Sequence, residues 1–112
     1  MYIYKDIQEK VFVKIIIGKK ITIKLKEKHQ VNALEVIECF YNKTGRYLQD
    51  KREVHRTSPP TFWFISQTNL GRKLKVVFVR YSQEEYIIKT SYKPNAMEKR
   101  IYCIDGMRRV KK

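Results

Sequence analysis

Residues 62–91 read FWFISQTNLGRKLKVVFVRYSQEEYIIKTS and contain three runs of the apolar, β-branched and aromatic residues that favour strands. We place these strands at residues 62–67, 73–80 and 86–91. The connectors, residues 68–72 and 82–85, are too short for a crossover, so neighbouring strands are expected to run antiparallel. Leu74, Val76 and Phe78 alternate with other residues, which indicates one buried face. The stretch predicts a β-meander.

Two further elements are expected near the N-terminus. Residues 11–17 are rich in valine and isoleucine and read as a strand that ends at Gly18. Residues 19–28 are ambiguous, because Ile21 to Ile23 favours a strand whereas Ile21, Leu25 and His29 fall on one helical face. We interpret them as a short helix.

A better-defined helix is expected over residues 33–42. Asn32 can cap it, Glu35 completes a capping box three residues later, and Gly45 ends it. Its apolar stripe is expected to pack on the sheet and consists of Leu34, Ile37 and Tyr41, with Val36 and Phe40 beside it.

The last helix is expected after Pro94. Asn95 is its predicted cap and Glu98 its capping-box partner, while residues 105–106 end it. Its apolar stripe is predicted to consist of Met97, Ile101 and Ile104. The polar residues 46–61 are expected to begin as a short strand and to end as a surface loop.

Together these elements predict one small α+β domain over residues 1–112, with a central antiparallel sheet and two or three helices packed on it. Residues 1–10 are expected to form a loosely held leader and residues 107–112 a basic tail. No apolar stretch approaches the length of a membrane span. The two cysteines, Cys39 and Cys103, are expected in the core of a protein of the reducing cytoplasm.

Charge gives the first indication of function. The chain has 25 basic and 11 acidic residues, a net charge of +14, so its partners are expected to be negative. Nucleic acid and an acidic protein both fit, although lysines also serve to keep a small protein in solution.

The sequence lacks the residues that several kinds of chemistry require. The carboxylates and histidines do not follow metal-ligand spacing, so no metal or other cofactor is expected. No glycine-rich phosphate loop and no recognisable serine or cysteine nucleophile occurs. What remains is a set of cationic and proton-carrying side chains: His29, Arg52, His55, Arg56, Arg72, Lys89 and Tyr92.

Such side chains suffice for RNA cleavage without metal, which needs a base for the 2′-hydroxyl, a positive clamp for the phosphate and an acid for the leaving oxygen. His55 beside Arg56 is the best pair, because an imidazole titrates near neutral pH and a guanidinium can grip phosphate. Each group also has a structural interpretation. His55 and Arg56 could simply lie in a solvated loop, and His29 could hydrogen-bond the backbone to close a turn. Lys89 could keep an exposed edge strand in solution.

Trp63, Tyr86 and Tyr92 could stack on unpaired bases, although strand aromatics more often belong to a core. Arg72 follows the hairpin glycine and could simply cover the turn.

The order of short segments over residues 28–102 resembles the BrnT-like toxins of the RelE superfamily. These segments are KHQV at 28–31, a glutamate-containing helix that ends in Cys39-Phe40, REVHR at 52–56, a hairpin around Gly71-Arg72, KTSYK at 89–93 and EKRIY at 98–102. The family pattern Ser-Ala-Arg before the last helix is replaced by Thr90-Ser91-Tyr92, so Tyr92 or Lys93 would have to substitute for the arginine.

The resemblance implies a RelE-like fold and the toxin of a type II toxin-antitoxin system. Such a toxin is a metal-independent endoribonuclease that inhibits translation and is held inactive by an antitoxin encoded beside it. On this hypothesis His55 or His29 is the base, Arg52, Arg56 and Arg72 hold the scissile phosphate, and Lys89 or Tyr92 assists the leaving group. The expected RNA-binding residues are Arg52, Arg72, Lys93 and Arg100. The alternative function is a non-catalytic module that binds RNA or an acidic protein.

Overall fold

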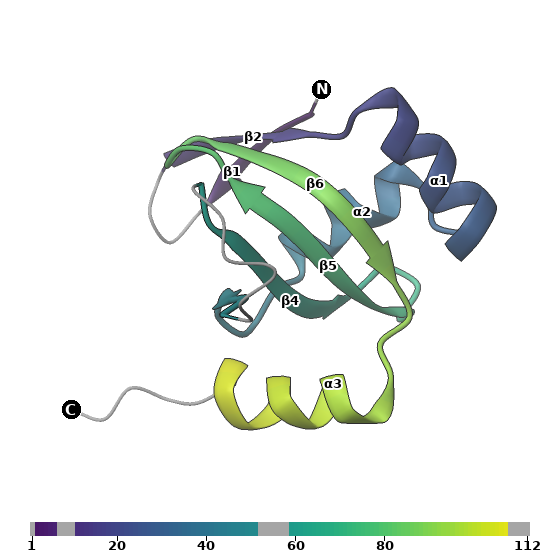
Figure 1. The fold of residues 1–112 in the computed structure, drawn as a ribbon, viewed down its shortest axis with the longest axis vertical. Helices are drawn as coiled ribbons and strands as arrows, with labels where there is room; N and C mark the ends of the chain where they lie inside the picture. The colour runs from purple at the N-terminus through teal and green to yellow at the C-terminus, as the bar shows by residue number, and fades with distance from the viewer. Residues whose placement is uncertain (1, 7–10, 52–58, 108–112) are drawn as a thin grey trace.

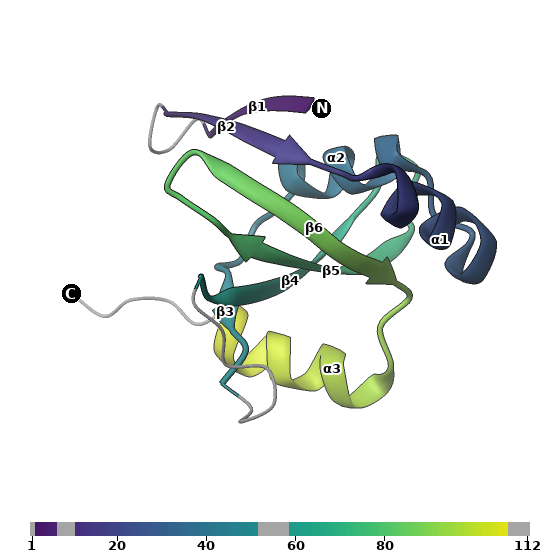
Figure 2. The same cartoon turned by 45° about the horizontal axis from the view of Figure 1, so that its top comes forward.

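A computed structural model describes residues 2–6, 11–51 and 59–107 (Figure 1). Within these ranges six strands form one sheet, with a helical layer on each side of it (Figure 2). The strands are β1 (Tyr2–Asp6), β2 (Val11–Ile16), β3 (Leu48–Gln49), β4 (Thr61–Gln67), β5 (Lys73–Arg80) and β6 (Glu85–Tyr92). The helices are α1 (Lys19–His29), α2 (Ala33–Tyr41) and α3 (Ala96–Ile101), which continues into the π-helical turn η2 (Tyr102–Gly106). The predicted α+β class is confirmed.

The meander β4, β5 and β6 forms the middle of the sheet, as predicted. The strand order is β1-β2-β6-β5-β4-β3. Phe64 lies opposite Val76, and Val77 lies opposite Thr90, with a bulge after Val77. The pairs β4/β5 and β5/β6 are antiparallel because their connectors are tight turns.

The N-terminal half of the sheet differs from the prediction in two ways. β2 pairs with β6 in parallel, with Ile15 opposite Tyr86, so the sheet is mixed rather than wholly antiparallel. Parallel pairing is possible because the connection between β2 and β6 is long and contains two helices and three strands. Residues 2–6 of the expected leader form β1, which pairs antiparallel with β2.

Helix α1 follows β2 directly and lies beside the C-terminal half of β6 (Figures 1 and 2). The helical interpretation of residues 19–28 is confirmed, and Leu25 is its buried residue. Gln30 ends the helix in the left-handed conformation, with a φ of 53°. A side chain is rarely stable there, and glycine is the usual residue.

Helix α2 begins where the capping pattern predicted it. The Asn32 N–H donates to the Glu35 carboxylate at 3.0 Å. The predicted apolar stripe is wrong, because Leu34 and Tyr41 are 62% and 59% exposed. The helix is instead rotated to bury Val36, Cys39 and Phe40, because the Phe40 ring packs among the aromatic rings of the sheet and of Tyr47.

The core lies between the sheet and the layer of α1 and α2. Phe40 contacts Phe64 with ring centroids 4.8 Å apart and Phe78 at 5.5 Å. The alternating residues of β5 are fully buried in this core, as predicted: Leu74, Val76 and Phe78. Burial of each such side chain contributes roughly 1.5–3 kcal/mol.

Helix α3 lies against the opposite face of the sheet (Figure 2). Its predicted capping box is present: the Asn95 N–H donates to Glu98 Oε1 at 2.9 Å, and the Glu98 N–H donates to Asn95 Oδ1 at 2.8 Å. The predicted apolar stripe is again wrong, since Met97, Ile101 and Ile104 are all exposed. The anchoring side chain is Tyr102, which is 5% exposed and packs beside Trp63.

Contact with the turn η2 explains why residue 45 is a glycine. Gly45 was expected to end the preceding helix. Helix α2 already ends at Tyr41. A Cβ atom on Gly45 would lie 2.9 Å from the Gly106 carbonyl oxygen and closer still to the Tyr102 hydroxyl. Glycine therefore allows the two segments to approach, and the Arg46 N–H then donates to the Gly106 carbonyl at 2.9 Å.

The two cysteines differ in their surroundings. Cys39 is buried as expected, and burial, aided by nearby carboxylates, raises the pKa of its thiol to about 12. Cys103 is exposed on η2, so its predicted place in the core is wrong. No helix among the described residues is long and apolar enough to cross a membrane.

Candidate nucleic-acid interface

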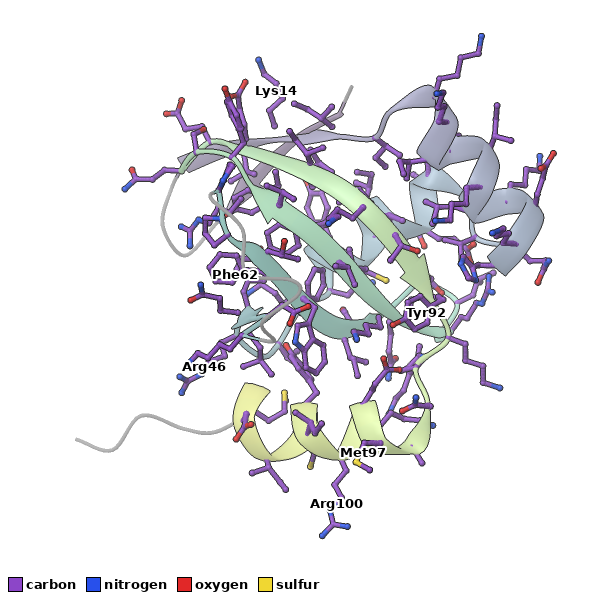
Figure 3. The ribbon with its side chains drawn as sticks, viewed as in Figure 1. Lys14, Arg46, Phe62, Tyr92, Met97 and Arg100 are labelled. Atoms are coloured by element: carbon purple, nitrogen blue, oxygen red, sulfur yellow. The ribbon has the colours of Figure 1, made fainter. Side chains whose placement is uncertain are left out.

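A groove of about 1210 Å³ lies on the face of the sheet that carries α3. Residues from the N-terminal and C-terminal parts of the chain meet there, because α1 borders β6 and α3 follows β6 in the sequence. Tyr92 and Arg46 lie on opposite sides of this face (Figure 3). The residues that line the groove are Lys24, Arg46, Tyr47, Leu48, Gln49, Asp50, Lys51, Thr61, Phe62, Trp63, Lys75, Val77, Lys89, Thr90, Tyr92, Glu98, Ile101 and Asp105.

The groove is basic and has aromatic walls. Five basic and three acidic side chains line it. The basic ones come from four separate parts of the chain, namely α1, the segment around β3, β5 and β6. Converging cations attract a polyanion, and the rings of Trp63 and Tyr92 form part of the groove wall.

Lys75 lies at the floor of the groove and is only 8% exposed. Its Nζ atom is 2.8 Å from Glu98 Oε2, and it lies 4.5 Å from the centre of the Trp63 ring. A buried ammonium group needs such partners, because leaving it unpaired away from water is costly. The ring and the carboxylate therefore hold this cation in one position.

Glu98 joins α3 to the groove. Its Oε1 atom completes the capping box, while Oε2 accepts hydrogen bonds from Lys75 and, at 2.9 Å, from the Tyr92 hydroxyl. Burial disfavours the charged carboxylate, but the hydrogen bonds from Lys75, the Asn95 N–H and Tyr92, together with the charge of Lys75, outweigh this effect. The pKa of Glu98 is consequently lower than its ordinary value of 4.5.

Among the predicted site residues, the structure brings Lys89 and Tyr92 together in the groove. His29 lies next to them, with its ring 5.5 Å from the Tyr92 ring, although it is not among the lining residues. The Tyr92 hydroxyl already donates to Glu98, so its proton is held at that oxygen. Lys89 is exposed and is the one basic residue of β6.

Arg72 does not line the groove. Its guanidinium donates to the carbonyl oxygens of His29 at 3.1 Å and Gln30 at 2.7 Å, and it pairs with Glu35 at 3.2 Å. It thus ties the β4–β5 hairpin to the junction between α1 and α2. These contacts give Arg72 a structural role where two helix ends meet, and its predicted contact with RNA stays a prediction.

The other predicted residues are not brought into the groove either. Lys93 and Arg100 are exposed and do not line it, and Arg100 points from α3 away from the sheet (Figure 3). Arg52, His55 and Arg56 lie outside the described residues. Tyr86 is 2% exposed and stacks on Phe78, so it belongs to the core.

Sequence reasoning missed Lys24, Lys75 and the role of Glu98. The signal for Lys75 was present, since it is a lysine inside the apolar run of β5. Glu98 was identified only as a capping residue, because its second oxygen has partners that are distant in the sequence.

A second cavity, of about 710 Å³, lies between the end of α2, β4 and α3. It is lined by two lysines, Lys73 and Lys99, and by a single aromatic residue, Tyr102. The larger groove is the better candidate for a polyanion because it has more cations and more aromatic rings. In the part of the chain that the structure describes, no three histidine, cysteine or acidic side chains could hold a metal ion.

No protein-family model matches this chain, and no curated protein resembles it closely enough to count as a relative.

Proposed function

We propose that the groove binds single-stranded RNA and that the chain is the toxin of a toxin-antitoxin pair, a metal-independent endoribonuclease that inhibits translation in the cytoplasm. The observation that carries the proposal is that Lys89 and Tyr92, both selected from the sequence as groups for RNA cleavage, line one basic groove with Trp63. The resemblance to BrnT-like toxins of the RelE superfamily supports the same function.

The reaction needs no metal. The 2′-hydroxyl loses its proton to a base and attacks the adjacent phosphorus, while the bond from phosphorus to the 5′-oxygen breaks. The 5′-oxygen then takes a proton from an acid, so the products are a 2′,3′-cyclic phosphate and a 5′-hydroxyl. Positive groups stabilise the charge that develops on the phosphate.

We assign these roles to the candidate residues as follows. Lys89 is the better acid for the leaving oxygen, because the Tyr92 proton is held by Glu98. His29, beside the Tyr92 ring, and His55 are the two candidate bases. Arg52 and Arg56 remain candidates for holding the phosphate, whereas Arg72 is committed to the helix junction.

The proposed partner is an acidic antitoxin. A net charge of +14 attracts a negative protein segment over a distance and speeds its capture. Covering the groove with carboxylates would exclude the RNA phosphates from the same cations.

Cleavage of a labelled single-stranded RNA in EDTA tests the proposal. Wild-type protein should produce ends with a 2′,3′-cyclic phosphate, and Lys89→Met should lower the rate by about 100-fold or more. Lys93→Met is the matched control, because Lys93 is an exposed lysine four residues further on that does not line the groove. Equal rates for the two variants would remove Lys89 from the mechanism.

A non-catalytic RNA-binding module is the second candidate. This function is favoured because His29, the one imidazole among the described residues, does not line the groove, where cleavage requires a base. Binding of RNA without cleavage by the wild-type protein, in the presence and absence of EDTA, would select this function.

A further inference from the structure

The groove is continuous with one flank of helix α1. This helix lies beside β6, so its Leu25 side is buried towards the core while Lys24 reaches the groove on the other face of the sheet. Lys24 is the one residue of α1 that lines the groove, so the helix borders the groove at this point, on the outer side of β6.

Three lysines form a row on this flank. Lys20, Lys24 and Lys28 are four residues apart, a spacing that places side chains one above another on a helix. With a rise of 1.5 Å per residue, successive lysines of the row are about 6 Å apart. All three are exposed. The other exposed lysines of the helix, Lys19 and Lys26, point away from the groove, because they lie roughly 150° around the helix axis from Lys24.

Helix stability does not explain the row. Lys28 lies in the last turn, where a cation favours the helix dipole, but like charges four residues apart destabilise a helix and Lys20 lies near its N-terminus, where a cation opposes the dipole. The first turn of α1 contains no acidic residue, and none of the three lysines forms an ion pair with another described residue. Solubility would be served equally by lysines at scattered positions.

We propose that Lys20, Lys24 and Lys28 bind successive phosphates of the RNA strand whose cleavage site lies in the groove. The inference rests on the proposed RNA binding and extends the substrate site beyond the groove. An RNA strand is favoured over an acidic protein because Lys24, the middle lysine of the row, lines the groove that is proposed to hold the cleavage site, so a strand that leaves the groove there passes along the row.

Two double variants with the same change in charge test the row. Lys20→Gln/Lys28→Gln removes two charges from the row, and Lys19→Gln/Lys26→Gln removes two charges from the opposite flank of the same helix. Glutamine has nearly the helix propensity of lysine, so both variants should fold as the wild type does, which circular dichroism checks. The probe is a fluorescent 12-nucleotide oligouridylate, titrated with the full-length protein in EDTA over a series of salt concentrations.

The row variant should reduce the slope of log K against log salt by about 1.4, since each phosphate contact to a single strand contributes about 0.7. If the row variant and the wild type bind equally at 1 M salt, the variant should bind roughly 25-fold more weakly than the wild type at 0.1 M salt. The control variant should change the slope by less than half as much.

Three outcomes would overturn the inference. If both variants lose the same affinity, only net charge matters, and the proposed RNA binding survives without the row. Oligoglutamate, titrated in the same way, is the comparison probe: if its binding depends on the row while RNA binding does not, the row contacts an acidic protein. If the wild-type protein does not bind RNA at all, the proposed function itself fails.

Discussion

The Lys75 ammonium and the Glu98 carboxylate lie 2.8 Å apart, and this ion pair joins the N-terminus of α3 to the centre of the sheet. The same carboxylate caps α3 and holds the Tyr92 hydroxyl. The docking of α3 and the geometry of the groove floor therefore depend on one side chain.

Glu98→Gln is expected to destabilise the protein by about 1–3 kcal/mol at pH 7, because three hydrogen bonds to a charged group are weakened. The native pKa of Glu98 lies below its ordinary value, so its contribution is present above pH 4.5 and is lost as the pH falls through the native pKa. Urea denaturation from pH 7 to pH 3 should show the wild type and the variant converging in acid.

The matched control is Glu84→Gln, at an exposed glutamate of the β5–β6 turn, which should change the free energy of unfolding by less than about 0.5 kcal/mol. A constant difference between wild type and Glu98→Gln at all pH values would contradict the assigned role.

Arg72→Ala is expected to lower the free energy of unfolding by about 2–3 kcal/mol, because two carbonyl groups and Glu35 lose a charged donor. Thermal denaturation measures this loss. Arg100→Ala, at an exposed position, should have little effect. At a temperature where the wild type and Arg72→Ala are both folded, they should bind RNA equally. A selective loss of RNA binding by Arg72→Ala would support the prediction from the sequence that Arg72 contacts RNA.

Gln30→Gly is expected to stabilise the protein by about 0.5–1 kcal/mol, since Gln30 has a φ of 53° and glycine has no strain there. Gln30→Ala, which keeps the Cβ atom, is the control and should not be stabilising. A melting temperature for Gln30→Gly below that of the alanine variant would contradict the reasoning.

Induction of the wild-type chain is expected to arrest bacterial growth, and co-expression of the antitoxin from the adjacent gene should relieve the arrest. Lys89→Met should be tolerated, whereas Lys93→Met should still be toxic, because only Lys89 lines the groove. Optical density after induction measures the difference. Normal growth with the wild-type chain at high expression would favour the non-catalytic module.

The parts of the fold that depend on local patterns were predictable from the sequence. Alternation located β4, β5 and β6 to within a residue or two, and the capping pairs located the starts of α2 and α3. These signals are encoded within a few neighbouring residues, so they need no knowledge of tertiary contacts.

The orientation of the helices was not predictable in the same way. Leu34, Tyr41, Met97 and Ile101 fit an apolar stripe by periodicity but are exposed. Which flank is buried is decided by distant partners, such as the rings around Phe40 and the contact of Tyr102 with Trp63. The parallel pairing of β2 with β6 also joins segments some seventy residues apart.

The candidate site shows the same division. Lys89 and Tyr92 were identified from residue type alone, because their side chains carry a charge or a proton suited to phosphate chemistry. Lys24 and Lys75 come from two other elements and reach the groove only through the strand order. Arg72 had the expected chemistry, but its partners are main-chain carbonyls that no sequence pattern reveals.

Ultraviolet crosslinking of single-stranded RNA to the intact protein, followed by mass spectrometry of the crosslinked peptides, tests most directly whether the groove holds RNA. The account predicts crosslinks at Trp63 and Tyr92, which line the groove. Tyr41 and Tyr81 are 59% and 61% exposed outside it and report on non-specific contact. Crosslinks at these two tyrosines, with none at Trp63 or Tyr92, would contradict the account.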